Sequence, residues 1–130
     1  MWICFSDSFL SVVAHKKDPS ALLIRARVKG HIEAVFPDAV VFSVEKSDYE
    51  YRAVVSRQDV AGAFAVRAMD ISYSDFKSSV KNKRLHDAYL AFWHIMNKLQ
   101  ASLLKKRPLL GRTKYLTMLD DHSYHRGTRK

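Results

Sequence analysis

The first part of the chain alternates between apolar and polar residues in the way that β-strands do. Residues 2–5 and 9–14 are short runs of β-forming residues, and the turn-like sequence Ser6-Asp7-Ser8 separates them. Residues 22–28 then alternate with a period of two. Leu22, Ile24, Ala26 and Val28 share one side, and Leu23, Arg25 and Arg27 share the other. This period predicts a half-buried strand.

Two more strands are expected after a short break in the pattern. Residues 31–36 have the composition of a short helix, which Pro37 would end. Residues 39–45 and 49–55 are again β-forming, and only the three residues 46–48 connect them. A connection this short favours an antiparallel hairpin.

The second half of the chain has helical periodicity. Ser56 and Asp59 have the spacing of a helix N-cap with its reciprocal acid, and the helix that follows should end near Met69. A short turn capped by Ser74 or Asp75 is expected next. A long helix is predicted over residues 83–106, because apolar side chains recur there for about five turns. These side chains are Leu85, Ala88, Tyr89, Phe92, Met96, Leu99 and Leu103. We expect this stripe to cover the sheet.

These elements predict an α+β protein: a small antiparallel sheet with helices packed on one face, a long C-terminal helix and a basic tail. The ferredoxin-like sandwich is a familiar example, although the expected order here is β-β-β-α-β-β-α-α. The length of 130 residues suits one domain. We place that domain at residues 1–107, followed by a partly flexible tail at 108–130.

Positive charge is concentrated near the carboxyl end. Residues 1–102 carry 14 Lys and Arg against 11 acids, whereas residues 103–130 carry eight against two, so the second stretch holds +6 of the net charge of +9. A balanced body with a cationic tail points to a polyanionic partner, such as nucleic acid or a nucleoprotein, or to an acidic protein surface.

The sequence contains no recognisable catalytic or cofactor-binding motif. Its four glycines form no phosphate loop or dinucleotide fingerprint, and no Gly-x-Ser-x-Gly or Ser-x-x-Lys motif is present. Cys4, the single cysteine, is better explained as a small core residue than as a nucleophile. Asp120, Asp121, His122 and His125 could ligate a metal, but the cations that flank them argue against it. We expect no cofactor, no metal and no enzymatic activity.

The basic residues therefore carry the functional prediction. Arg25 and Arg27 share the outward side of one predicted strand, and Arg52 would extend a basic strip if it faces the same way. A further cluster surrounds the end of the long helix. The predicted nucleic-acid-binding residues are Arg25, Arg27, Arg52, Lys105, Lys106, Arg107, Arg112 and Lys114. Recognition would be led by backbone charge, because no known base-reading motif is present.

Several segments also carry a resemblance. They are Met1-Trp2-Ile3, residues 9–13, 23–27, 48–52 and 73–77, and the sequence His86-Asp87-Ala88-Tyr89 with Trp93. Together they resemble a group of small uncharacterised proteins of bacteria and their phages, over about residues 1–100 and without the cationic tail. The group has no established activity. The resemblance implies a compact single domain and a phage or mobile-element origin, and it implies no site.

Two functions follow as expectations. The first is a non-enzymatic binding protein that docks on a polyanion, nucleic acid or nucleoprotein, through its basic surface and tail. The alternative is a phage- or mobile-element-encoded inhibitor or adaptor that binds a host machine, for example one used in defence. No secretory signal or membrane span is expected, and the single cysteine suits a cytoplasmic protein. The pattern leaves the choice between monomer and dimer open.

Overall fold

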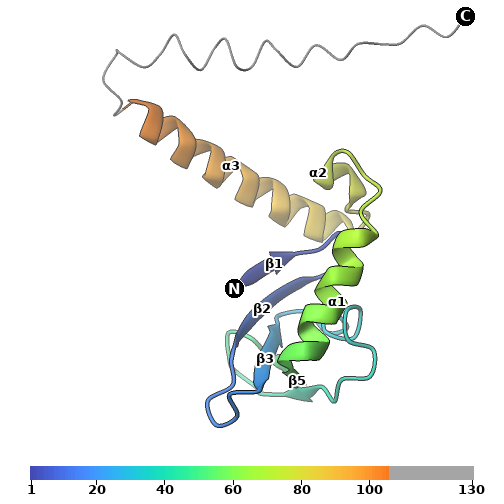
Figure 1. The fold of residues 1–130 in the computed structure, drawn as a ribbon. Helices are drawn as coiled ribbons and strands as arrows, with labels where there is room; N and C mark the ends of the chain where they lie inside the picture. The colour runs from blue at the N-terminus through green and yellow to red at the C-terminus, as the bar shows by residue number, and fades with distance from the viewer. Residues whose placement is uncertain (106–130) are drawn as a thin grey trace, which may run out of the picture. The chain divides into compact units, whose positions relative to one another are not determined.

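A computed structural model of the chain describes residues 1–105, in which strands come first and helices follow (Figure 1). The strands are β1 (Trp2–Cys4), β2 (Phe9–Ala14), β3 (Ala21–Ala26), β4 (Phe42–Ser43) and β5 (Tyr51–Ser56). The helices are α1 (Arg57–Met69), α2 (Phe76–Ser79) and α3 (Lys83–Lys105). The strands form one open antiparallel sheet in the order β1-β2-β3-β5-β4. The predicted α+β class is confirmed.

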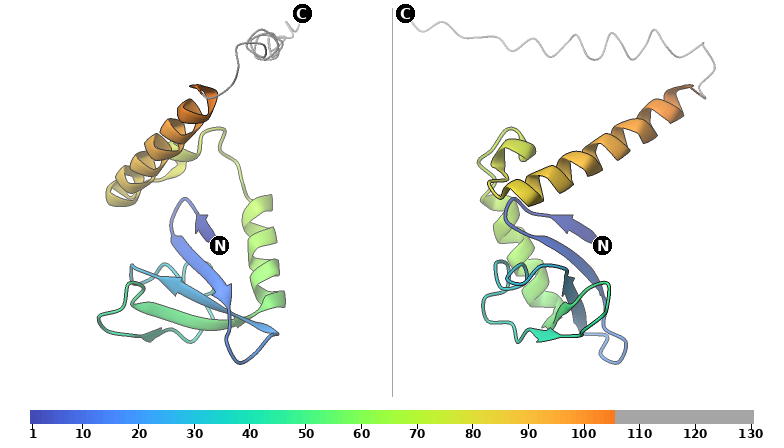
Figure 2. Two further views of the ribbon diagram at one scale, coloured as in Figure 1. Left: turned by 90° about the vertical axis from the view of Figure 1, so that its left-hand side faces the viewer. Right: turned by 180° about the vertical axis from the view of Figure 1, so that it is seen from behind.

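One face of the sheet carries the core. Leu10, Ile24 and Ala53 are fully buried on this face, and they lie on three neighbouring strands. Helix α1 lies alongside the sheet (Figure 2). It contributes Val60 to the core, and the partly buried Phe64 packs against the same cluster. Burial of this apolar surface is the main force that holds α1 on the sheet.

Helix α1 begins at the predicted N-cap residue, Ser56. The Ser56 hydroxyl accepts a hydrogen bond from the Asp59 backbone N–H at 3.0 Å and lies 2.7 Å from the Asp59 carboxylate, to which it donates. These contacts satisfy a donor that has no partner inside the helix. Near the end of the helix, Ala68 is exposed.

The segment before the hairpin differs from the prediction. Residues 31–35 form consecutive turns and no helix. Gly30 enters this segment with φ +90°, a left-handed conformation that suits glycine, and Pro37 follows after six residues. The two i→i+4 hydrogen bonds of this segment, from Ala34 N–H to the Gly30 carbonyl and from Phe36 N–H to the Ile32 carbonyl, are not consecutive, so no regular helix forms. The turns nevertheless bury Ile32, Val35 and Phe36 in the core.

Helix α3 confirms the expected element, and its two halves belong to different units. Tyr89 is 7% exposed, whereas every side chain from Ala91 to Lys105 is exposed. Residues Met1–Ala91 form one compact unit, and a second unit begins at Phe92. Among the described residues, the second unit contains no other helix or strand, so nothing within that unit covers the apolar side chains from Phe92 onward. The predicted domain boundary at residue 107 and the tail 108–130 lie outside the described range.

Candidate polyanion-binding site

Three predicted arginines meet around one tyrosine. The guanidinium carbon of Arg25 lies 4.5 Å from the centre of the Tyr49 ring, and that of Arg27 lies 4.1 Å from it. Arg52 donates from Nε to the Tyr49 carbonyl oxygen at 3.1 Å. Tyr49 itself is 3% exposed. We call Arg25, Arg27, Arg52 and Tyr49 the arginine cluster.

The sheet register explains why the cluster forms. Arg25 on β3 pairs directly with Arg52 on β5, so the two side chains leave the sheet on the same face. Two cations side by side would repel each other, but the Tyr49 ring offers its negative face to the guanidinium groups. Tyr49 reaches this position because the hairpin between β4 and β5 brings it back over the sheet. The predicted basic strip is present in the structure.

The three arginines differ in their burial and in how many of their N–H donors remain available to a ligand. Arg25 is half-buried, donates from Nη2 to the Ser11 hydroxyl at 2.8 Å, and has a buried Nε without a partner among the described residues. Arg52 is also half-buried, and its Nε is used by Tyr49. Arg27 is exposed. Since a guanidinium has five N–H donors, each of the three keeps donors for a ligand, and Arg27 keeps the most.

Among the described residues, no carboxylate lies close enough to neutralise these cations. Within residues 1–105, the ion pairs lie elsewhere: Arg67 with Asp7 at 2.9 Å, and Lys83 with Asp87 at 2.8 Å. Arg25, Arg27 and Arg52 have no acid within 4.0 Å in this part of the chain. Three unneutralised guanidinium groups on one surface favour an anion, above all one with several phosphates.

Aromatic residues that sequence reasoning missed lie in the same row of the sheet. Trp2 pairs with Ser11, Ser11 with Arg25, Arg25 with Arg52, and Arg52 with Phe42. These five residues cross all five strands on the face opposite the core. Trp2 is 66% exposed and Phe42 is 45% exposed. Their alignment depends on strand register, which the sequence pattern alone does not specify.

The remaining predicted residues lie at the end of the described range or beyond it. Lys105 is the last residue of α3 and is exposed. Lys106, Arg107, Arg112 and Lys114 lie outside the described residues, and so does the possible metal-binding sequence at 120–125. Two cations near the start of α3 are already engaged: Lys81, which precedes the helix, donates to the Ser78 carbonyl, and Lys83, the first residue of the helix, pairs with Asp87.

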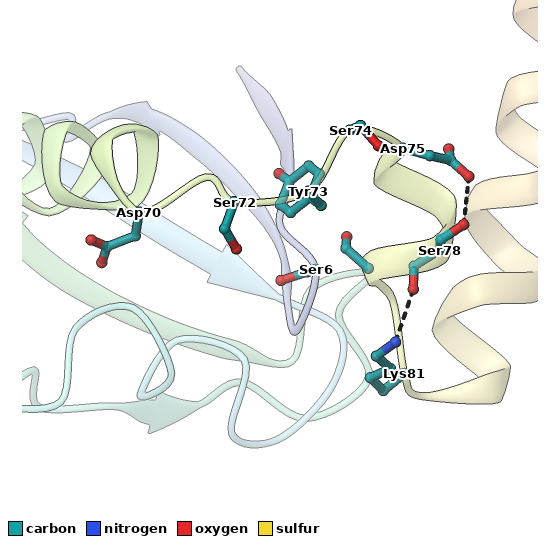
Figure 3. A pocket seen from close by; sticks show the side chains of 9 residues that line it. Ser6, Asp70, Ser72, Tyr73, Ser74, Asp75, Ser78 and Lys81 are labelled. Atoms are coloured by element: carbon teal, nitrogen blue, oxygen red, sulfur yellow. Dashed lines mark hydrogen bonds between the residues drawn. The ribbon is translucent and has the colours of Figure 1, made fainter. Parts of the chain in front are cut away.

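A separate pocket of about 600 Å³ is open and lined mostly by serines (Figure 3). Its best-defined interaction is the Ser78 hydroxyl, which donates to Asp75 at 2.6 Å. This hydrogen bond lowers the pKa of the Asp75 carboxyl, which also caps α2. A carboxylate with a lowered pKa is a weak base, so the pair does not activate the serine as a nucleophile. His86 and His94 do not line this pocket.

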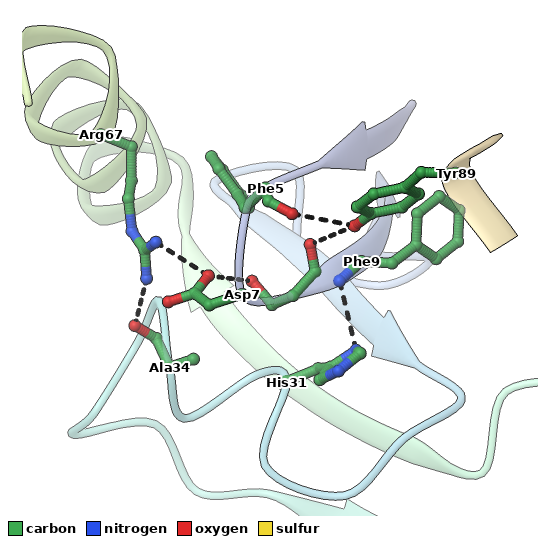
Figure 4. A network of polar contacts seen from close by, with 8 residues as sticks. Phe5, Asp7, Phe9, His31, Ala34, Arg67 and Tyr89 are labelled. Atoms are coloured by element: carbon green, nitrogen blue, oxygen red, sulfur yellow. Dashed lines mark hydrogen bonds and ion pairs between the residues drawn. The ribbon is translucent and has the colours of Figure 1, made fainter. Parts of the chain in front are cut away.

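A polar network joins the turn between β1 and β2 to its neighbours (Figure 4). Asp7 pairs with Arg67 of α1, and the Phe9 backbone N–H donates to His31 Nδ1 at 3.2 Å. The Tyr89 hydroxyl lies 2.8 Å from the Ser8 carbonyl oxygen and 3.0 Å from that of Phe5. Burial lowers the pKa of His31 and raises the pKa of Tyr89 well above its usual value. Both groups are therefore neutral near pH 7, and the network is structural.

Cys4 and the potential metal ligands are the other reactive groups of residues 1–105. Cys4 is half-buried, and burial raises the pKa of its thiol, which disfavours the nucleophilic thiolate. Residues 1–105 contain no group of three or more His, Cys, Asp or Glu placed to hold a metal ion. None of the helices in this range has both the length and the apolar character needed to cross a membrane.

Comparisons with protein-family models, with curated proteins and with solved structures found no match for this chain. They give no support to the resemblance to bacterial and phage proteins, so an origin in a phage or mobile element stays a prediction.

Proposed function

We propose that this chain is a non-enzymatic binding protein that docks on a polyanion, either nucleic acid or a nucleoprotein, through its basic surface and tail. One observation carries the proposal: Arg25, Arg27 and Arg52 gather around Tyr49 with no acid within 4.0 Å in the described part of the chain. The Tyr49 ring and the hydrogen bonds to Ser11 and Tyr49 hold the three cations together, but none of these contacts neutralises their charge, so a ligand with several phosphates would be attracted to them.

The charge of the whole chain supports the same proposal. The net charge of +9 would attract a polyanion from a distance, and the surplus of cations after Leu103 would add contacts beyond the sheet. Phosphate contacts position a protein without reading sequence. We therefore expect binding that depends strongly on salt and weakly on nucleotide sequence.

The test is a titration of the full-length protein with DNA and with RNA over a salt series. The double variant Arg27→Ala/Arg52→Ala should weaken binding and reduce the slope of log K against log salt by roughly 1.4 to 1.8, because each lost phosphate contact removes about 0.7 to 0.9. Lys16→Ala/Lys17→Ala is the matched control, since it removes two exposed charges in a loop. Absence of binding at low salt, or binding that ignores salt, would refute the proposal.

A second candidate is an inhibitor or adaptor that binds a host protein, encoded by a phage or mobile element. The observation that favours it is a line of exposed apolar side chains on α3. Ile95, Leu99 and Leu103 are 62%, 49% and 58% exposed, and their spacing of four residues puts them along one side of the helix. Helices often dock in an apolar groove of a partner through such a side.

Capture from a host lysate separates the two candidates. The protein-binding function predicts a partner that is retained after nuclease treatment and lost with Leu99→Asp. The polyanion-binding function predicts that nuclease removes the captured material and that Leu99→Asp has no effect. Leu99→Asp is suitable because the residue is exposed and the substitution should leave the fold intact.

A further inference from the structure

We propose that the sheet face opposite the core binds single-stranded nucleic acid, with Trp2 and Phe42 stacking on bases while the arginine cluster contacts the phosphates. The inference rests on the proposed function and names its ligand. Its central observation is the row Trp2, Ser11, Arg25, Arg52 and Phe42, which the register lines up across all five strands.

The row places two kinds of group side by side. Its middle carries the arginines, and its two ends carry exposed aromatic rings. With neighbouring strands about 4.8 Å apart, Trp2 and Phe42 lie about 19 Å from each other along the row. Single-stranded nucleic acids bind to surfaces of this kind, in which a basic track follows the backbone and aromatic rings stack on successive bases.

Trp2 is held in place for this role. Its indole makes an edge-to-face contact with Phe9 at a centroid distance of 6.3 Å, and it nevertheless stays 66% exposed. The contact with Phe9 restricts the indole ring on one side, and most of the residue remains accessible. A large exposed indole costs solubility when it has no ligand, and a fixed one loses little conformational entropy when a ligand binds.

The same geometry disfavours the other polyanions. The bases of a duplex are already stacked on one another, so they are out of reach of a ring on the surface of a sheet. An acidic peptide would pair with the arginines but offers no flat ring surface for Trp2 and Phe42. Because stacking tolerates any base, the lack of a base-reading motif in the sequence does not conflict with this ligand.

The experiment uses Trp2 as its own reporter. The chain has two tryptophans, so the full-length variant Trp93→Phe leaves Trp2 as the only indole. This variant is titrated at low salt with a single-stranded oligothymidylate of about 12 nucleotides, within the site sizes known for such surfaces. Parallel titrations use a duplex of the same length, inorganic polyphosphate and an acidic peptide.

Of the four ligands, we expect only the single strand to quench Trp2 fluorescence strongly. A second variant carries Trp2→Ala in addition, and its binding of the single strand is measured by the fluorescence anisotropy of a labelled oligonucleotide. The added substitution should weaken this binding by about 10-fold or more and leave the binding of polyphosphate unchanged. Met69→Ala removes an 86% exposed apolar residue from α1 and serves as the matched control. Circular dichroism checks that each variant is folded.

The outcomes separate this inference from the proposed function. If polyphosphate or the peptide quenches Trp2 as strongly as the single strand, or if Trp2→Ala binds the single strand normally, the stacking role is wrong while polyanion binding stands. If no polyanion binds at low salt, the proposed function fails together with the inference.

Discussion

Helix α1 and the second half of α3 both repeat apolar side chains at helical spacing, but α1 packs against a sheet within its own unit, whereas the second half of α3 belongs to a unit without a strand among the described residues. In α1, Val60 is 3% exposed, and Ala63 and Phe64 pack against the core. In α3, the more regular apolar stripe from Phe92 to Leu104 is exposed throughout the described residues. Periodicity therefore predicts that a helix forms and which side is apolar, but it does not identify what covers that side.

The largest expected effect contrasts a core leucine with a stripe leucine. Leu10→Ala should lower the free energy of unfolding by about 2–5 kcal/mol, because Leu10 is 0% exposed and its loss leaves a cavity. Leu99→Ala should change it by no more than about 0.5 kcal/mol, since Leu99 is 49% exposed. Urea denaturation followed by circular dichroism measures both. A large effect of Leu99→Ala that grows with protein concentration would show that the stripe is buried between copies.

A smaller effect is expected where α3 is anchored. Tyr89→Phe removes the hydroxyl that lies beside the Ser8 and Phe5 carbonyl oxygens, and it should cost about 1–2 kcal/mol because a buried acceptor loses its donor. Tyr73→Phe is the control, since Tyr73 is 37% exposed. Thermal unfolding compares the two variants, and equal melting temperatures would contradict the anchoring role of Tyr89.

The smallest effect is a pH dependence within the unit Met1–Ala91. Burial lowers the pKa of His31 in the folded protein, so the unfolded chain takes up the proton first as the pH falls. The contribution of His31 to the free energy of unfolding should therefore be complete at neutral pH. It should decrease as the pH falls below the ordinary histidine pKa of about 6.5, and the decrease should end once the pH is below the pKa of His31 in the folded protein.

His31→Asn tests this expectation. Asparagine can still accept the hydrogen bond from the Phe9 N–H, but it does not titrate. Urea midpoints at pH 7.5 and at pH 5 should therefore differ less in the variant than in the unmodified protein. An identical difference in both proteins would mean that another group is responsible.

The sequence predicts those parts of the fold that depend on neighbouring residues. Strand β2 and the Ser56 cap follow from local pattern, and the side shared by Arg25 and Arg27 follows from strand alternation. Other features depend on contacts between distant residues. Arg52 joins the cluster through the register of β3 and β5, and Tyr49 lies under the arginines only because the hairpin folds back.

The tyrosine beneath the arginines also bears on which substitutions this surface tolerates. Lysine at position 25 or 27 would keep the formal charge, but a tetrahedral ammonium cannot lie flat on an aromatic ring as a planar guanidinium does. Such an exchange leaves the isoelectric point almost unchanged and still alters the shape of the surface. In this region the flatness of the side chain is therefore as important as its charge.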